Sequence, residues 1–206
     1  EIVARTEEIS IEDLIQDEEV VITVSHTGYI KRTALSTYRS QRRGGKGRIG
    51  MTTRVEDAVQ HLFVASTHDY ILVFLSSGRM HWLKVHEIPD VSSAGRGKAV
   101  VNLIRITADD KVAATVAVRD FPADRYVVLA SRKGFVKKTP LAAFGRPSVA
   151  GIIAVSLDEG DGVLAAGISD GESEIFMGTS LGKSIRFRES DVRPMGRTAR
   201  GVIGIR

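Results

Sequence analysis

The chain has 206 residues, of which 43% are apolar and 26% charged, and its formal net charge is +4. Its apolar runs of about four to eight residues are far shorter than the roughly 18 that cross a bilayer, so we expect neither a transmembrane span nor a secretory signal. Cysteine is absent, which excludes disulfides, zinc–thiolate sites and thiol nucleophiles and fits a cytoplasmic protein.

The first 19 residues form an acidic lead-in. Residues 1–20 hold eight acids against the single base Arg5. Only residues 10–17 have a helical pattern, with Ser10 in the capping position. Because the chain begins at Glu1, we expect it to be a segment of a longer protein.

Four repeats of about fifty residues follow the lead-in, at about 20–67, 68–119, 124–169 and 173–206. Their turn glycines lie 50, 56 and 48 residues apart, at Gly28, Gly78, Gly134 and Gly182. A second set follows each turn by 19, 19, 17 and 19 residues, at Gly47, Gly97, Gly151 and Gly201. Spacing this regular predicts an array of repeated structural units.

Each repeat has the pattern of short β-strands. The first strands, such as 70–75 and 126–131, are rich in β-branched and aromatic residues and lead to a tight turn. We expect the turn glycine to be the second central residue of that turn, where positive φ is required. Third strands are expected at 98–106, 152–157 and 202–206, and fourth strands at 61–67, 112–118 and 162–168. This predicts an all-β, propeller-like array of four-stranded blades, with the fourth repeat ending before its last strand.

Basic residues gather in corresponding parts of the repeats. Residues 28–54 hold eight bases and no acid, and the most basic stretch is the loop at 40–48. Its glycines let backbone N–H groups approach an anion, while Arg and Lys neutralise phosphates. Loops at 93–98, 145–147 and 195–201 are weaker versions of it. We predict a curved positive rim that binds duplex DNA through its phosphates, without reading bases.

Residues 41–47 read QRRGGKG, and in this box and in most of its length the chain resembles the C-terminal domain of the DNA gyrase A subunit. The resemblance implies a β-pinwheel, in which neighbouring blades exchange strands, with six repeats in the complete domain against four here. It implies a non-catalytic domain that wraps DNA with a fixed hand, so that a type IIA topoisomerase introduces negative supercoils in the bacterial nucleoid.

The partners that the resemblance implies are double-stranded DNA, the remainder of the gyrase A subunit, and the gyrase B subunit, with no membrane. No cofactor is expected in this domain, whereas the parent enzyme uses ATP and Mg. The box residues are Gln41, Arg42, Arg43, Gly44, Gly45, Lys46 and Gly47. Further predicted DNA contacts are Lys31, Arg32, Arg48, Arg79, Lys84, Arg96, Lys98, Lys133, Lys137, Lys138, Arg146, Lys183, Arg186, Arg188, Arg197 and Arg200. No catalytic or metal-ligating residue is predicted.

Other interpretations are weaker. Residues 45–50 match G-x-G-x-x-G, but no apolar strand precedes them and no convincing helix follows. Residues 178–184 approach a phosphate-binding loop with its first glycine one residue too close. The five histidines lack metal-ligand spacing. The acids at Asp57, Asp109 and Asp161 fit turns, and Trp82 and Phe135 fit core packing better than base stacking.

Two alternative functions stay open, one outside the topoisomerase family and one within it. A protein-interaction propeller would have an unbiased or apolar rim, and the chain lacks the signatures of the common propeller repeats. The C-terminal domain of topoisomerase IV has a similar fold but a degenerate box, so the intact sequence at 41–47 favours gyrase.

Overall fold

The computed structural model describes residues 11–38, 51, 57–92, 94–107 and 110–206. The predicted box at 41–47 and the neighbouring Arg48 lie outside the described residues. Within the described part, no helix is long and apolar enough to span a membrane.

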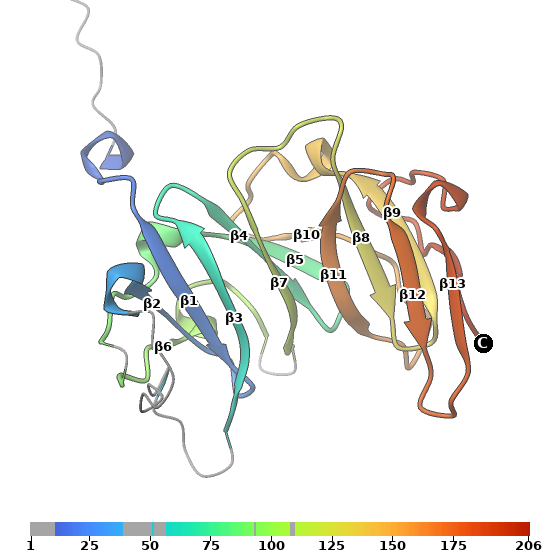
Figure 1. The fold of residues 1–206 in the computed structure, drawn as a ribbon, viewed down its shortest axis with the longest axis horizontal. Helices are drawn as coiled ribbons and strands as arrows, with labels where there is room; N and C mark the ends of the chain where they lie inside the picture. Colours follow the sequence, from blue (N-terminus) through green and yellow to red (C-terminus); the bar gives the residue numbers. More distant parts are fainter. Residues whose placement is uncertain (1–10, 39–50, 52–56, 93, 108–109) are drawn as a thin grey trace, which may run out of the picture.

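The described residues form four antiparallel sheets, which lie side by side along the long axis of the molecule (Figure 1). The first sheet has the order β3 (Val59–Ser66), β1 (Glu19–Ser25), β2 (Tyr29–Ala34), β6 (Lys98–Ala99). The second has the order β10 (Ile152–Ile153), β5 (Arg79–Lys84), β4 (Tyr70–Leu75), β7 (Val112–Val118). The third has the order β11 (Val163–Ser169), β8 (Tyr126–Ser131), β9 (Phe135–Pro140), β14 (Val202–Ile203). The fourth is the hairpin of β12 (Glu174–Gly178) and β13 (Ser184–Arg188). We refer to the four sheets as blades 1 to 4.

Neighbouring blades exchange strands. By sequence β6 belongs to the second repeat, β10 to the third and β14 to the fourth, yet each pairs with the second strand of the preceding blade. The carbonyl of the turn glycine fixes the exchanged segment: Gly28 accepts from the N–H of Val100 at 2.8 Å, and Gly78 accepts from that of Ala154 at 2.9 Å. The all-β, strand-exchanged architecture predicted for this chain is therefore confirmed.

The hairpin turns differ in detail from the prediction. The N–H of each turn glycine donates to the residue three positions earlier, as Gly28 does to Ser25 at 3.0 Å, so the glycine follows the two central residues. All four turn glycines have φ between 81° and 86°. The turn is thus the three-residue type with a terminal glycine in the left-handed region, and the expectation of a second central glycine was wrong.

The third strands are also much shorter than expected. Only Lys98–Ala99 of residues 98–106 is extended, and the chain then turns into the 3-10 helix η4 (Val100–Asn102). The hydrogen bond from Val100 to Gly28 ends the pairing there. In the described part of the lead-in, residues 11–19, the chain forms the 3-10 turn η1 (Ile11–Leu14).

Two apolar clusters hold the stack together. One joins blades 1 and 2 through residues such as Ile22 and Ile71, and the other joins blades 2 and 3 through residues such as Phe74 and Leu129. Strand β4 contributes to both clusters with alternate side chains, and Ile71, Leu72, Val73, Phe74 and Leu75 are all 0% exposed. Because the central blade is covered on both faces, β4 is continuously apolar rather than alternating.

A short 3-10 helix follows the second strand of each blade. We call the side of the blades that carries these helices and the Gly/Arg loops after them the outer edge. The helices are η2 (Leu35–Thr37), η3 (Val85–Glu87), η5 (Leu141–Phe144) and η6 (Glu189–Asp191). They set the position from which the Gly/Arg loops start.

Candidate nucleic-acid interface

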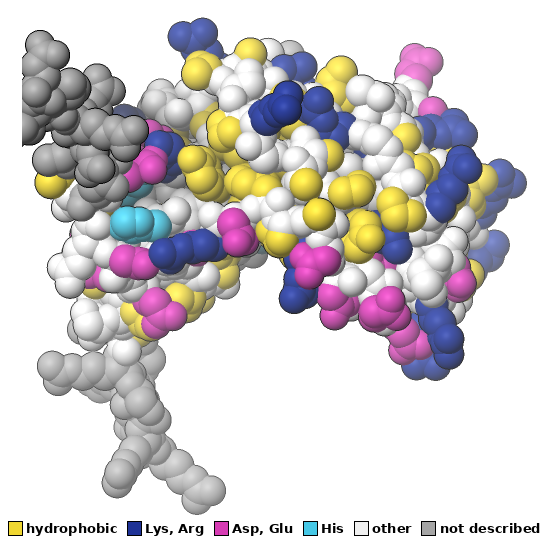
Figure 2. Space-filling view, turned by 90° about the horizontal axis from the view of Figure 1, so that it is seen from above, with side chains coloured by type: hydrophobic (Ala, Val, Ile, Leu, Met, Phe, Trp, Pro, Cys, Tyr) yellow, Lys and Arg dark blue, Asp and Glu magenta, His cyan; other side chains and the backbone are white. Residues whose placement is uncertain are grey.

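The predicted DNA contacts divide into three groups by exposure. Exposed side chains are Lys98, Lys133, Arg146, Lys183, Arg186, Arg188 and Arg200. Half-buried side chains are Arg32, Arg79, Lys84, Arg96 and Arg197. Buried side chains are Lys31, Lys137 and Lys138. In Figure 2, Lys and Arg gather at the end of the molecule that carries blade 4.

The three buried lysines cannot contact DNA phosphates in this conformation, which corrects the sequence interpretation for them. Lys31, Lys137 and Lys138 are 0%, 1% and 4% exposed. Lys138 donates to the carbonyl of Glu189 at 3.0 Å and lies 3.9 Å from its carboxylate. Its ammonium also lies 5.0 Å from the centroid of the Tyr126 ring. These lysines make their contacts inside the stack, between one repeat and the next.

The position four residues after the turn glycine is a link between blades. Lys138 occupies it in blade 3 and reaches η6 of the next repeat. Trp82 occupies it in blade 2, and its indole N–H donates to the carbonyl of Phe144 in η5 at 2.8 Å. Trp82 also packs against the second apolar cluster, as predicted for a core residue. The other three repeats have a basic residue at this position, Arg32, Lys138 and Arg186. Trp82 thus makes with an indole N–H the contact that Lys138 makes with its ammonium.

Arginines on the outer edge are held at equivalent places by the preceding repeat. Arg96, just before Gly97, lies with its guanidinium carbon 3.6 Å from the centroid of the Tyr29 ring. Arg200, just before Gly201, lies 4.6 Å from the centroid of the Phe135 ring and donates to Asp158 at 2.9 Å. Sequence reasoning missed Tyr29 and interpreted Phe135 only as a core residue, whereas Phe135 is half-buried and lies under Arg200. The signal for both was an aromatic residue directly after the turn glycine.

The joint between blades 2 and 3 has the reverse arrangement. Here the residue after the turn glycine is Arg79, and the residue before Gly151 is Ala150. The Arg79 guanidinium donates to the carbonyl of Ala150 at 2.7 Å. An arginine thus stands at each of the three joints between blades, supplied by the loop in two cases and by the hairpin in one.

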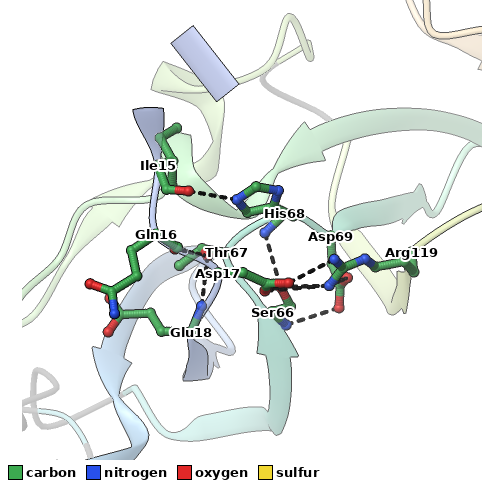
Figure 3. A network of polar contacts seen from close by, with 9 residues as sticks. All are labelled: Ile15, Gln16, Asp17, Glu18, Ser66, Thr67, His68, Asp69 and Arg119. Carbon is green, nitrogen blue, oxygen red and sulfur yellow. Dashed lines mark hydrogen bonds and ion pairs between the residues drawn. The ribbon is translucent and has the colours of Figure 1, made fainter. Parts of the chain in front are cut away.

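Residues 12–18 of the acidic lead-in pack against the corner where blades 1 and 2 meet (Figure 3). Asp17 accepts a hydrogen bond from the Arg119 guanidinium at 2.7 Å and one from the Ser66 hydroxyl. The Arg119 bond is the main reason that the pKa of Asp17 falls to about 2, and the Ser66 bond adds to it. The His68 ring bonds to the carbonyl of Ile15 at 2.8 Å. Nearby, Glu12 forms an ion pair with Lys84, a predicted DNA contact.

The turn acids stabilise hairpins. Asp57 accepts from the backbone N–H of Thr27 at 3.0 Å and from its hydroxyl at 2.6 Å. Asp161 accepts from the Ser131 hydroxyl at 2.6 Å and from the N–H of Lys133 at 2.9 Å. Burial opposes ionisation of Asp57, but the hydrogen bonds from Thr27, Ser25 and Ala58 together outweigh it and hold its pKa below the usual range. The predicted turn role is thus confirmed at these two positions, whereas Asp109 lies outside the described residues.

Among the described residues, no three His, Cys, Asp or Glu side chains lie close enough together to hold a metal ion. Desolvation by burial lowers the pKa of His61, His81 and His86. These histidines therefore favour the neutral form near pH 7. Among the described residues, the surface carries exposed lysines and arginines, such as Lys98 and Arg146, whose positive charge is suited to binding an anionic polymer.

The comparisons with known proteins agree with this geometry. The profile of the family described as "DNA gyrase C-terminal domain, beta-propeller" matches residues 19–66, 69–119, 125–170 and 173–206. The DNA gyrase A subunit of Klebsiella oxytoca is 45% identical over all of this chain, and that of Escherichia coli K12 is 42% identical. The chain spans 24% of the length of each of these relatives.

Solved structures share the fold. The C-terminal domain of DNA topoisomerase IV superposes with a TM-score of 0.76 at 29% identity, covering 91% of this chain and 57% of that one. The C-terminal domain of DNA gyrase A superposes with a TM-score of 0.75 at 24% identity, covering 92% of this chain and 61% of that one. From the profile match and the identity over its whole length, the chain belongs to the DNA gyrase C-terminal domain family.

Proposed function

We propose that the chain binds duplex DNA through the phosphates along its outer edge and wraps the duplex with a fixed hand. The observation that carries the proposal is the arginine held at each of the three joints between blades, Arg96, Arg79 and Arg200. Cations at successive joints of a curved stack form a row that a bent duplex can follow, because DNA binding without base readout depends on phosphate contacts and DNA deformability. We propose that the box at 41–47, which is in the most basic stretch of the sequence, contributes further phosphate contacts.

In the whole protein, this wrap would present a second duplex segment to the strand-passage machinery, and ATP-driven passage would leave negative supercoils. The proposed partners are DNA, the remainder of the gyrase A subunit, and the gyrase B subunit. The chain acts without chemistry of its own, and the parent enzyme supplies the ATP- and Mg-dependent steps. The supports are the family membership and the 42–45% identity to gyrase A subunits.

A second candidate is the role of a topoisomerase IV C-terminal domain, supported by that structure's 29% identity to this chain against 24% for the gyrase A structure, at nearly equal TM-scores. Such a domain would bind DNA here without imposing a handed wrap. The intact sequence QRRGGKG at 41–47 favours the gyrase role.

A linking-number assay separates the two. The chain is bound to relaxed circular DNA at low salt, the DNA is relaxed again by a nicking-closing topoisomerase, and the topoisomers are resolved after the protein is removed. The gyrase role predicts a shift toward positive linking number that the pair Arg42→Ala and Arg43→Ala abolishes. Binding without a shift would support the topoisomerase IV role, and absence of binding would overturn both.

A further inference from the structure

We propose that Lys31 and Lys137 are positioning residues, each of which holds the Gly/Arg loop of the next repeat in the conformation that presents its arginines to DNA. This inference rests on the proposed DNA-binding function. It assigns a role to two cations that have no access to phosphate themselves.

Lys137 provides the fullest set of contacts. It lies on β9, three residues after the turn glycine Gly134, and its side chain is 1% exposed. Its ammonium donates to the carbonyl of Ala154 at 2.6 Å and to the carbonyl of Arg197 in the loop at 195–201. A buried ammonium requires acceptors in place of lost water, so the two carbonyls and the cation fix one another. The hydrogen bond from Lys137 of blade 3 thereby fixes the loop backbone at Arg197.

At the joint between blades 1 and 2, the residue three positions after the turn glycine holds the loop of the next repeat in the same way. Lys31 lies three residues after Gly28 on β2 and is 0% exposed. Its ammonium donates to the carbonyl of Ser92, at the start of the loop that ends at Gly97. At the middle joint the position is His81, which is 2% exposed, and Gly151 packs directly on its ring. A Cβ added at Gly151 would lie 2.5 Å from that ring.

The loops are also anchored at both ends. At their beginning, the N–H of Val91 donates to the carbonyl of Arg32 at 3.1 Å, and that of Met195 donates to Lys138 at 2.8 Å. At their end, a Cβ added at Gly97 would lie 2.3 Å from the carbonyl oxygen of Ile30, and one added at Gly201 would lie 2.5 Å from that of Val136. Between these two ends, the ammonium of the buried lysine donates a hydrogen bond to a backbone carbonyl of the loop. That middle region carries Arg197, and Arg200 follows it.

The functional consequence is preorganisation. A loop that is already fixed loses less conformational entropy when it binds, so its phosphate contacts contribute more to affinity. Removing the buried ammonium of Lys31 or Lys137 should weaken DNA binding while the number of phosphate contacts stays the same. A side chain that touches phosphate behaves differently, because its loss also lowers the salt dependence of binding.

The test compares the 206-residue chain with the variant Lys137→Met and the control Lys133→Met. Lys133 is an exposed lysine of the same hairpin. Binding of a linear duplex is measured over a series of salt concentrations, together with amide hydrogen exchange. For Lys137→Met we expect affinity to fall at least fivefold, the slope of log affinity against log salt to stay unchanged, and the Ala199 amide to exchange at least tenfold faster. For Lys133→Met we expect the slope to fall by about 0.9 with loop exchange unchanged.

Two results would overturn the proposal: a slope for Lys137→Met that falls by about 0.9, or unchanged affinity together with unchanged exchange at residues 195–201. If Lys137→Met unfolds the chain, Lys31→Met is the second variant, read out by exchange in residues 94–97. Faster exchange there without loss of global stability supports the proposal, and unchanged exchange overturns it. Failure of the unmodified chain to bind DNA would overturn the proposed function alone, since the exchange comparison still decides whether the lysines position the loops.

Discussion

The guanidinium of Arg96 stacks on the ring of Tyr29, with its central carbon 3.6 Å from the ring centroid. The two residues come from different repeats, and the contact places a cation of the second repeat against the hairpin of the first blade. The side chain of Arg96 is therefore held at the outer edge before any DNA arrives.

The first prediction concerns this stack. Replacing Tyr29 by Leu keeps the charge of Arg96 but removes the aromatic face, which contributes about 1 kcal/mol in such pairs. DNA affinity should fall roughly fivefold, with an unchanged salt slope. Fluorescence titration of a labelled duplex at several salt concentrations measures both quantities. The control Arg96→Gln removes the cation and should lower the slope by about 0.9. Equal slopes for the two variants would contradict the assignment of Arg96 as a phosphate contact.

The second prediction concerns the buried pair of Lys138 and Glu189, whose charged atoms lie 3.9 Å apart. Glu189 is 0% exposed and occupies the position held by Leu35, Val85 and Leu141 in the other repeats. Glu189→Gln leaves the ammonium of Lys138 buried without its counter-ion, which should cost about 3 kcal/mol of unfolding free energy.

The matched control for that pair replaces both charges by apolar side chains, as at the joint between blades 2 and 3, where Trp82 and Leu141 occupy the corresponding positions. The double variant Lys138→Met with Glu189→Leu should recover most of the lost stability, because a buried ion pair is often replaced by apolar side chains at little cost. Urea denaturation of Lys138→Met, Glu189→Leu and the double variant, each against the unmodified chain, measures the coupling. Additive losses would mean that the two charges do not stabilise one another.

The third prediction concerns pH and Lys137. Burial, with a smaller contribution from the charge of Arg197, lowers the pKa of Lys137 from 10.5 to about 8. Between these two values the unfolded chain binds more protons at this side chain than the folded chain does, so the unfolding free energy rises with pH. The rise due to this group is on the order of 3 kcal/mol between pH 8 and 10.5. Burial also lowers the pKa of Lys31, in the same direction.

The variant Lys137→Met isolates this contribution. The difference in unfolding free energy between the unmodified chain and the variant should change by that amount across the same pH range, and should stay constant below pH 7. Chemical denaturation at half-unit pH steps provides the data. A constant difference over the whole range would show that Lys137 titrates normally and is hydrated.

The strands could be predicted from the sequence because local rules determine them. Residues 70–75, 112–118 and 126–131 are the strands β4, β7 and β8 with the same bounds, and each first-to-second strand turn ends in a glycine with positive φ. Strand exchange was expected only from family resemblance. It follows from contacts such as Val100 with Gly28, which join residues far apart in the chain.

The buried lysines could not be separated from the exposed ones. In an open sheet, alternation along the strand would show which face is covered. In a stack of blades both faces are covered, so Lys137 and Lys138 are buried although they are neighbours on one strand. A run of bases on a strand is therefore ambiguous here, whereas bases directly before the loop glycines, Arg96 and Arg200, reach the outer edge with partly exposed side chains.

The last prediction concerns the lead-in. Asp17 binds Arg119 at 2.7 Å and also the hydroxyl of Ser66, and its pKa falls to about 2. Because the folded-state pKa lies below that of the unfolded chain, the contact is fully present above about pH 4 and is lost as pH falls through about 2. Asp17→Asn removes the charge at every pH. We therefore expect faster hydrogen exchange at the amides of Glu18 and Thr67, which bond to the partner segment, with the exchange of strand β4 unchanged.

Salt provides an independent check on the lead-in, since the pair of Asp17 and Arg119 is exposed to solvent and screened by ions. Raising the ionic strength from about 0.1 to 1 M should speed the exchange of the Glu18 amide in the unmodified chain and have little effect in Asp17→Asn. The control Glu19→Gln changes a neighbouring exposed acid that forms no ion pair with any residue the structure describes, and should leave the lead-in in place. Salt sensitivity that persists in Asp17→Asn would mean that another charge, such as Glu12 paired with Lys84, fastens the segment instead.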